Sequence, residues 1–460
     1  MSLLSGDLRE VLYLGAAICF ILALKGLSSP RTARRGNLIG AAGAVLALLV
    51  TFFAFDLRNV VAILVAIAIG TALAVPAARR VQMTQMPQLV ALFNGVGGGA
   101  AALVALLELA VIADVATQER GNLAAIAFTV LVGSVSFSGS VVTFLKLQEL
   151  MTTRPVILPG ARPLLVGGLA AGVVASLAVL VSGALWVGVL LLLVGLALGV
   201  MLVLPVGGAD VPIVISLLNA FTGLTVAAGG FVLGNTLLLV AGTLVGASGT
   251  ILTRLMAAAM GRSVVGVLFG ALRGGSTAGS TAVSDRPVRS TGPDDVAILL
   301  NYARRVIIVP GYGLAVAQAQ HTIRELAELL EARGIEVLYA IHPVAGRMPG
   351  HMNVLLAEAN VPYDEVFELE DINGQFPQAD VAFVIGANDV TNPAAKTDPQ
   401  SPIYGMPILD VERAKTVLFI KRGMGSGYAG VENELFFRDN TMMLFGDAKK
   451  VVDDILKAFD

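Results

Sequence analysis

The feature that most constrains this chain is a change in hydropathy near Arg262. Up to that residue the sequence consists of long apolar runs between short polar segments. From Val306 it reads V-I-I-V-P-G-Y-G, an apolar stretch followed by a glycine turn. The mean hydropathy of the 460 residues is +0.81, and only 14% of them are charged. A water-soluble chain would expose much of this apolar material, so the composition favours a membrane protein.

Nine apolar segments are each long enough to cross about 30 Å of hydrocarbon. They are 11–27, 37–55, 60–75, 87–112, 123–145, 163–182, 185–204, 211–233 and 236–260. Because nine is odd, the two ends of this region, 1–262, lie on opposite sides of the membrane. After it, residues 263–295 have the Gly-, Ser-, Thr- and Pro-rich composition of a flexible linker, and residues 296–460 form a second domain.

The basic residues between the segments predict which side is which. One set of loops carries Lys25, Arg31, Arg34, Arg35, Arg79, Arg80, Lys146, Arg154, Arg162, Arg254 and Arg262. The other set, with the N-terminus, carries only Arg9, Arg58 and Arg120. Since basic loops stay inside, we expect a multi-pass protein with its N-terminus outside and its C-terminal domain in the cytoplasm. The net charge of −2 argues against nucleic acid as a partner.

Residues 296–460 alternate between strand and helix patterns. Strands are predicted at 306–310, 336–342, 366–369, 381–385, 416–421 and 441–445, and helices at 316–333, 352–359, 411–414 and 448–458. This alternation is typical of a Rossmann-like, doubly wound parallel sheet. The predicted fold is therefore a polytopic α-helical membrane domain joined to a C-terminal α/β domain.

A glycine turn directly follows the first predicted strand, with the sequence Gly311-Tyr312-Gly313-Leu314-Ala315-Val316. Such glycines permit a tight turn and let the backbone approach a pyrophosphate at a helix N-terminus. The alternative is a turn that serves packing alone. The region after the second strand, Tyr339 to Pro343, lacks the carboxylate that a conventional NAD site uses, which leaves room for NADP.

Two further motifs follow predicted strands at the same edge of the sheet. Gly386-Ala387-Asn388-Asp389 comes after 381–385, so we expect Asp389 to face a cofactor across from Gly311 and Gly313. The pair Lys421-Arg422 precedes a glycine-rich loop that runs to Gly430 and suits a phosphate group. The alternatives are a capping role for Asp389 and a solvated basic edge for the pair. The loop after 336–342 adds Arg347 to this edge.

Polar residues also occur at depth in the apolar segments. Asn94 and Asn219 lie in the middle of theirs, serines alternate from Ser134 to Ser140, Ser248 lies in the ninth segment, and Asp210 lies near a segment end. Such groups usually bond to neighbouring helices. The functional alternative is a hydrated path for an ion or proton.

Long strings in this chain resemble the beta subunit of the proton-translocating NAD(P)+ transhydrogenase, essentially from end to end. They are 309–320, 342–359 (H-P-V-A-G-R-M-P-G-H-M-N-V-L-L-A-E-A), 386–393 and 427–431, together with Met86-Pro87 and Leu217–Gly223 in the apolar part. The resemblance implies an enzyme of the Si/Re-specific type. This chain would bind NADP(H) and accept hydride from NADH on a separate alpha subunit, driven by inward proton flow. It also implies a dimer of alpha/beta units and no metal.

The resemblance further implies roles for individual residues, with the cofactor lying on the sheet in reversed orientation. Lys421 and Arg422 would take the 2′-phosphate, the loop containing Arg347 would cover the pyrophosphate, and Asp389, the expected catalytic residue, would lie by the nicotinamide. The remaining expected cofactor residues are Gly311, Tyr312, Gly313, Ala315, Val316, Gly386, Asn388, Gly427, Tyr428 and Ala429.

One departure concerns the proton path, for which we expect Asn94, Asn219, Ser248 and Asp210. Some family members carry a histidine where this chain has Asn94, and an amide does not titrate near neutral pH. All three histidines of the chain (His321, His342 and His351) lie beyond the apolar region. A partner membrane subunit is therefore expected to supply a histidine, with Asp210 as the alternative carrier.

Two other classes of protein share this layout. One is a channel or transporter gated by a cytosolic nucleotide-sensing domain, which usually has an acidic residue after the second strand and a selectivity motif. The other is a membrane-anchored NADP reductase, for which nine spans exceed what anchoring requires.

Overall fold

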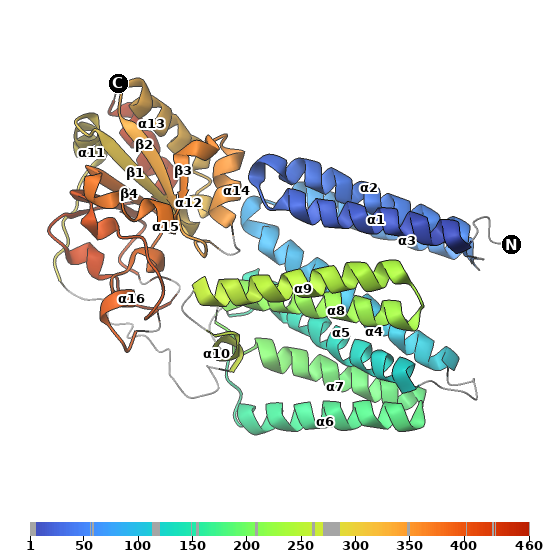
Figure 1. Ribbon diagram of the computed structural model, residues 1–460. Coiled ribbons are helices and arrows are strands. Elements are labelled where there is room, and N and C mark those ends of the chain that lie inside the picture. The colour runs from blue at the N-terminus through green and yellow to red at the C-terminus, as the bar shows by residue number, and fades with distance from the viewer. Residues whose placement is uncertain are drawn as a thin grey trace. The chain divides into compact units, whose positions relative to one another are not determined.

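The computed structural model describes residues 6–55, 57, 59–112, 120–148, 150–152, 156–207, 210–259, 263–269, 286–346, 350–401, 403–425, 427 and 429–459. It separates into two compact units. One comprises Met1–Val81, Gln88–Val206 and Val214–Thr253, and the other Gln82–Pro87, Gly207–Ile213 and Arg254–Asp460. The first unit holds the long apolar helices and the second holds a parallel sheet with its covering helices (Figure 1).

The described residues contain nine helices long and apolar enough to span a membrane, which confirms the predicted number of spans. They are α1 (Gly6–Leu27), α2 (Pro30–Ala54), α3 (Val60–Arg80), α4 (Met86–Ile112), α5 (Arg120–Leu147), α6 (Ala161–Ser182), α7 (Leu185–Val203), α8 (Val211–Val232) and α9 (Thr236–Ala259).

Several of these helices extend beyond their apolar segments. Helix α2 begins at Pro30, seven residues before the predicted start at 37, because proline suits the first helical turn. Helix α3 continues through Pro76 to Arg80, so its basic pair lies in the last helical turn instead of a loop. Hydropathy marks the part of a helix that lies in hydrocarbon, and the helix itself continues into the headgroup region.

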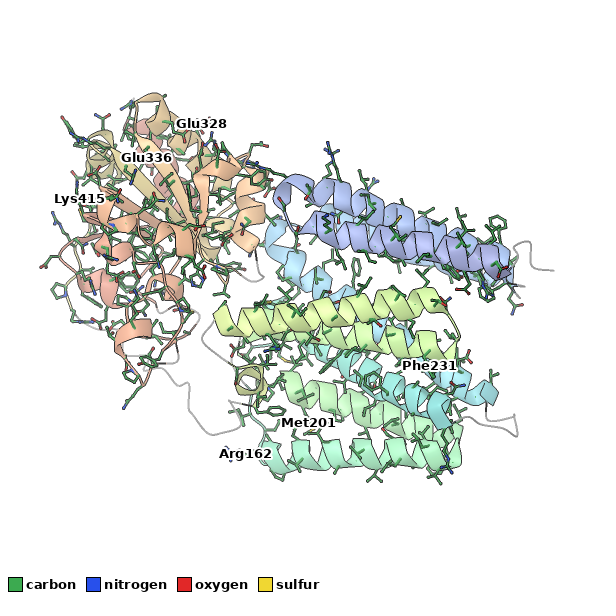
Figure 2. All side chains as sticks on the ribbon, viewed as in Figure 1. Arg162, Met201, Phe231, Glu328, Glu336 and Lys415 are labelled. Atoms are coloured by element: carbon green, nitrogen blue, oxygen red, sulfur yellow. The ribbon has the colours of Figure 1, made fainter. Side chains whose placement is uncertain are left out.

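Helix α5 is the most enclosed of the nine described spans. In its most apolar stretch 67% of the residues are buried, whereas α3 has no buried residue. Its closest neighbour is α7, where a Cβ added at Gly195 would lie 2.0 Å from the Ser134 hydroxyl. A Cβ at Gly199 would lie 2.1 Å from the Ser138 hydroxyl. Small residues thus let the two backbones approach closely. The side chains on the outside of this unit are mainly apolar, as Phe231 illustrates (Figure 2).

A buried lysine caps the C-terminal end of α7. Lys146, 1% exposed, donates hydrogen bonds from its ammonium group to the backbone carbonyls of Val203 (3.3 Å), Leu204 (2.6 Å) and Val206 (2.8 Å). Carbonyls at a helix C-terminus lack partners within the helix and carry partial negative charge. All three hydrogen bonds of the Lys146 ammonium group are therefore made to backbone carbonyls that favour a cation.

The second unit is built on a six-stranded parallel sheet in the order β3-β2-β1-β4-β5-β6. The strands are β1 (Arg305–Pro310), β2 (Glu336–Ile341), β3 (Val366–Glu368), β4 (Val381–Ile385), β5 (Thr416–Lys421) and β6 (Thr441–Phe445). Each predicted strand is present to within one residue at either end. This order is that of the doubly wound dinucleotide-binding fold, in which the crossover reverses between β1 and β4.

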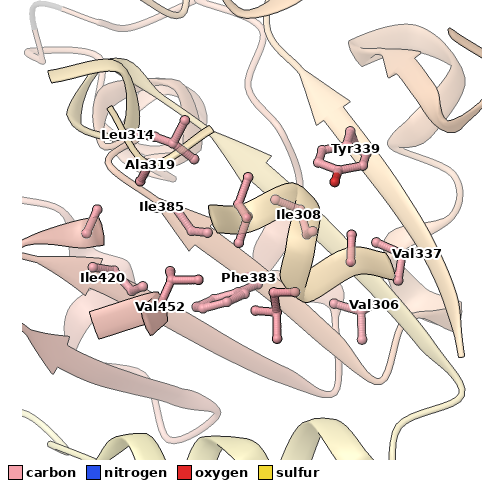
Figure 3. Close-up of a cluster of buried hydrophobic side chains, with 14 of the residues drawn as sticks. Val306, Ile308, Leu314, Ala319, Val337, Tyr339, Phe383, Ile385, Ile420 and Val452 are labelled. Atoms are coloured by element: carbon pink, nitrogen blue, oxygen red, sulfur yellow. The ribbon is translucent and has the colours of Figure 1, made fainter. Parts of the chain in front are cut away.

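Alternate residues of the strands pack on opposite faces of the sheet. Val306, Ile308 and Phe383 belong to one buried cluster, shown in Figure 3, and Ile307 and Val384 belong to the other. The main helices are α11 (Pro293–Asn301), α12 (Tyr312–Val316), α13 (Gln320–Ala332), α14 (His351–Glu358) and α17 (Ala448–Lys457). Short helices are η4 (Tyr363–Glu365), α15 (Leu369–Ile372), η5 (Phe376–Gln378), η6 (Asp389–Thr391), α16 (Ala394–Thr397), η7 (Val411–Arg413) and η8 (Glu434–Phe437).

The prediction of one continuous helix over 316–333 is wrong. Helix α12 ends at Val316, and Gln318 adopts a left-handed backbone with φ 50°. The N–H groups of Ala319 and Gln318 donate to the carbonyls of Leu314 and Ala315, which is the pairing of a Schellman motif. Glycine usually occupies the left-handed position, so this sequence gives no sign of the break.

The predicted linker, 263–295, contains ordered structure at both ends. Residues Val264–Phe269 form α10, and Ser290 forms a parallel bridge with Met443 of β6. The middle part, 270–285, lies outside the described residues, so its flexibility stays a prediction.

Candidate nucleotide-binding site

The glycine turns after β1 and β4 pack directly on one another. The N–H of Gly311 donates to the Ile385 carbonyl (2.9 Å), and the N–H of Gly313 donates to the Gly386 carbonyl (2.9 Å). A Cβ at Gly311 would lie 2.4 Å from the backbone of Ala387, and one at Gly313 would lie 2.7 Å from the Cα of Gly386. Gly386 also has φ +69°, a conformation that favours glycine.

These contacts give the two glycines a packing role, one of the two roles that the sequence left open. The N–H groups of Gly311 and Gly313 are bonded within the chain, and their expected role in cofactor binding stays a prediction. The turns still fix the carboxyl ends of β1 and β4, where ligands bind in doubly wound sheets.

Asp389 lies against the loop that follows β5. Its carboxylate accepts a hydrogen bond from the N–H of Ala429 (2.9 Å), and a Cβ at Gly427 would lie 2.3 Å from its Oδ1. Asn388 accepts at its side-chain oxygen from the Asn433 amide (3.0 Å). The structure therefore brings together four of the predicted residues: Asn388, Asp389, Gly427 and Ala429.

The two cations after β5 differ in their surroundings. The Lys421 ammonium lies 4.9 Å from the centroid of the Phe436 ring and donates to the Gly425 carbonyl. Burial lowers the pKa of Lys421, and the nearby Asp389 carboxylate offsets part of that effect. The Arg422 side chain is 65% exposed and pairs with Asp447 at 3.2 Å. The Lys421 ammonium therefore contacts the loop after β5 and interacts with the Asp389 charge, whereas Arg422 is exposed to solvent.

The remaining predicted residues are distributed around these turns. The Tyr312 ring lies 6.1 Å from the His351 ring, Ala315 is buried, and Val316 is 42% exposed. Arg347 and Tyr428 lie outside the described residues, so their expected roles stay predictions.

Three buried side chains support the site without having been predicted in it. His342 bonds through Nε2 to the Pro407 carbonyl (2.7 Å), and its Nδ1 accepts from the Val344 N–H (3.2 Å). Burial lowers the pKa of His342 to about 4, although the Pro407 carbonyl favours the protonated ring. Asn392 and Asn433, both fully buried, donate to the backbone of Glu432 and Asn388. His342 and Asn392 lie within the strings that carry the family resemblance, whereas nothing in the local sequence marks Asn433.

Within the membrane unit, Asn94 belongs to a hydrogen-bonded chain of side chains. Its amide donates to Ser140 (3.0 Å) and Ser136 (3.4 Å), and the Ser136 hydroxyl lies 2.6 Å from that of Thr222. The Ser136 hydroxyl also donates to the Leu218 carbonyl (3.0 Å). The chain thus links α4, α5 and α8.

The structure gives the surroundings of the other residues expected in the proton path. Asn219 is exposed on α8, and Ser248 is exposed on α9 and donates to the Val245 carbonyl of its own helix. Asp210 is buried just before α8. The path through Asn94, Asn219, Ser248 and Asp210 stays a prediction. Hydropathy predicts the depth of a residue in the membrane but not which way its side chain faces.

Among the described residues, nine apolar helices and a parallel sheet in dinucleotide-fold order define a multi-pass membrane protein with a Rossmann-like domain. Residues 9–458 match the family model described as NAD(P) transhydrogenase beta subunit. Two curated relatives from Rhodospirillum rubrum, both named NAD(P) transhydrogenase subunit beta, are 53% identical over 461 residues, covering 99% of this chain and 99% of theirs. The chain belongs to the NAD(P) transhydrogenase beta-subunit family.

Proposed function

We propose that this chain is the NADP(H)-binding subunit of a proton-translocating transhydrogenase and accepts hydride from NADH held on a separate alpha subunit. The observation that carries the proposal is the contact of the loop after β5, through Gly427 and Ala429, with Asp389 at the end of β4. In doubly wound sheets ligands bind at this edge, and Lys421 is the last residue of β5, directly before this loop. The R. rubrum relatives are named as beta subunits, which supports an alpha partner.

The residues at this edge of the sheet fit NADP(H) better than NAD(H). From His342 to Gly346, the described residues after β2 include no carboxylate that would repel a 2′-phosphate. Lys421 and Arg422 would bind that phosphate, the Arg347 loop would cover the pyrophosphate, and Asp389 would orient the nicotinamide amide group. When bound, NADP(H) supplies the ring that gains or loses hydride. The protein's own contribution is to hold and orient that ring.

The proton path of this proposal begins with the chain of Asn94, Ser136, Ser140 and Thr222. Amides and hydroxyls conduct protons only with a titratable group or water beside them, and this chain's histidines all lie outside α1–α9. The exposed Asn219 and Ser248 would therefore meet a membrane helix of the alpha partner that carries a histidine, with Asp210 as an alternative carrier. A polar side chain exposed at membrane depth is costly without such a neighbour.

The remaining parts of the proposal rest on the family resemblance and, for the orientation in the membrane, on the distribution of basic residues. The enzyme would be of the Si/Re-specific type and would act as a dimer of alpha/beta units in a bacterial inner membrane. The N-terminus would lie outside, the α/β domain would lie in the cytoplasm, and inward proton flow would drive NADPH formation.

The test uses this chain reconstituted with its alpha partner in proteoliposomes. We expect tight NADPH binding by this chain and hydride exchange only when the NAD(H)-binding subunit is present. Asn219→Leu should abolish proton-coupled turnover, and Thr243→Val, an exposed polar residue of α9 bonded within its own helix, should not. Reduction of a lone organic substrate would refute the proposed activity, and full coupling in Asn219→Leu would remove that residue from the path.

A further inference from the structure

Arg286 is the first residue described after 269, and its side chain contacts Glu432, Glu434 and Phe437. We call these four side chains the clamp. The Arg286 guanidinium donates two hydrogen bonds to the Glu434 carboxylate, at 3.1 and 2.9 Å, and a third to Glu432 at 3.5 Å. Its central carbon also lies 3.8 Å from the centroid of the Phe437 ring. Paired hydrogen bonds and stacking on an aromatic ring are both specific to arginine.

The residues that follow Arg286 are fixed to the outer edge of the sheet. The N–H of Met443 in β6 donates to the Arg289 carbonyl (2.8 Å), and the N–H of Thr291 donates back to the Met443 carbonyl (3.0 Å). Val288 packs against the buried cluster that contains Phe436. The segment 286–291 is therefore anchored by its backbone to β6 and by Arg286 to Glu432 and Glu434.

The two glutamates flank Asn433, the fully buried amide described above. Asn433 donates to the backbone carbonyl of Asn388 (3.2 Å) and to its side-chain oxygen (3.0 Å), and the Glu432 carbonyl accepts from the Asn392 amide (3.0 Å). Asn388 precedes Asp389, whose carboxylate accepts from Ala429. An unbroken series of contacts thus runs from Arg286 to Asp389.

We propose that Arg286 is a positioning residue that holds the loop 429–435 against Asn388 and Asp389, so that the segment arriving from the membrane helices sets how tightly the nucleotide is retained. This rests on the function proposed above. The clamp is well suited to a local effect, because its charged side chains are 34–52% exposed and such pairs contribute little to overall stability. Displacing Arg286 would release the loop and leave the sheet intact.

The experiment measures NADPH release from the reconstituted alpha/beta complex, with and without an imposed proton gradient. Arg286→Gln and Glu434→Gln should each accelerate release by about 2- to 10-fold and weaken its response to the gradient. Their combination should be no worse than Arg286→Gln alone, because that change already removes the contact with Glu434. Arg286→Lys should lie between the wild type and Arg286→Gln, since lysine keeps the charge but loses the paired geometry.

The matched control is Arg413→Gln, an exposed arginine of the same domain that lies 4.0 Å from the Asp410 carboxylate. Thermal unfolding of each variant shows whether the fold is kept, and Arg286→Lys still tests the inference if Arg286→Gln does not fold. A wild-type complex that fails to bind NADPH would overturn the proposed function. If the wild type binds NADPH but release from the Arg286 variants, and its gradient response, equal those of the wild type, the inference alone is overturned.

Discussion

A single methyl group added at Gly427 tests whether the contact of the β5 loop with Asp389 forms the nucleotide site. Gly427 is not in the left-handed region, so alanine is sterically allowed in its own backbone. The new Cβ would nevertheless lie 2.3 Å from Asp389 Oδ1 and 2.9 Å from the Asn388 amide nitrogen. Either the carboxylate or the loop must therefore move away.

Overpacking of this kind costs about 1–3 kcal/mol, which corresponds to roughly 5- to 150-fold weaker binding when only the bound state needs the close contact. The assay is NADPH titration of the full chain, followed by nucleotide fluorescence. Gly374→Ala is the matched control, because a Cβ at that turn would have no atom within 4 Å. Wild-type affinity in Gly427→Ala, with the control equally unchanged, would refute the assignment of this contact to nucleotide binding.

Three further predictions concern stability. Burial lowers the pKa of His342 from 6.5 to about 4, so between these values the unfolded chain binds a proton that the folded domain excludes. The free energy of unfolding should therefore fall by roughly 3 kcal/mol as the pH is lowered from 6.5 to 4. His342→Gln should flatten the pH dependence of the urea midpoint. Lys146→Met leaves three carbonyls at the end of α7 without their cation. The free energy of unfolding of the detergent-solubilised chain, measured by heat or denaturant, should therefore fall by on the order of 2–4 kcal/mol. Lys25→Met, at an exposed position, should leave the free energy of unfolding unchanged. Gly195→Ala should prevent the close approach of α5 and α7 and lower the melting temperature, whereas Gly167→Ala, with no atom within 4 Å, should leave it unchanged.

The strands of the α/β domain could be predicted because each is a short apolar run bounded by turn residues, and the parallel, doubly wound sheet follows from their alternation with helices. The break after Val316 could not, since a glutamine occupies the position where glycine would signal it. In the membrane unit, the number of spans follows from hydropathy, but the outward orientation of Asn219 depends on how the helices pack.

In the candidate site too, some residues could be placed from the sequence and others could not. Asp389 and Lys421 could be placed because each directly follows a predicted strand, and the carboxyl ends of parallel strands share one edge. Arg286 and Asn433 could not, because their partners lie 146 to 148 and 45 residues away in the sequence and no local pattern connects them. The use of Gly311 and Gly313 in packing likewise depends on Gly386 and Ala387, which belong to a different turn.

The pairing of residues 289–291 with Met443 has a consequence for the behaviour of the α/β domain as a separate molecule. β6 is the last strand of the sheet, and an uncovered edge strand can pair with another chain and lead to aggregation. In this protein the incoming segment occupies the hydrogen-bonding groups of Met443. A soluble fragment that begins at 293 or 296 would expose that edge, whereas one that begins before Arg286 keeps it covered.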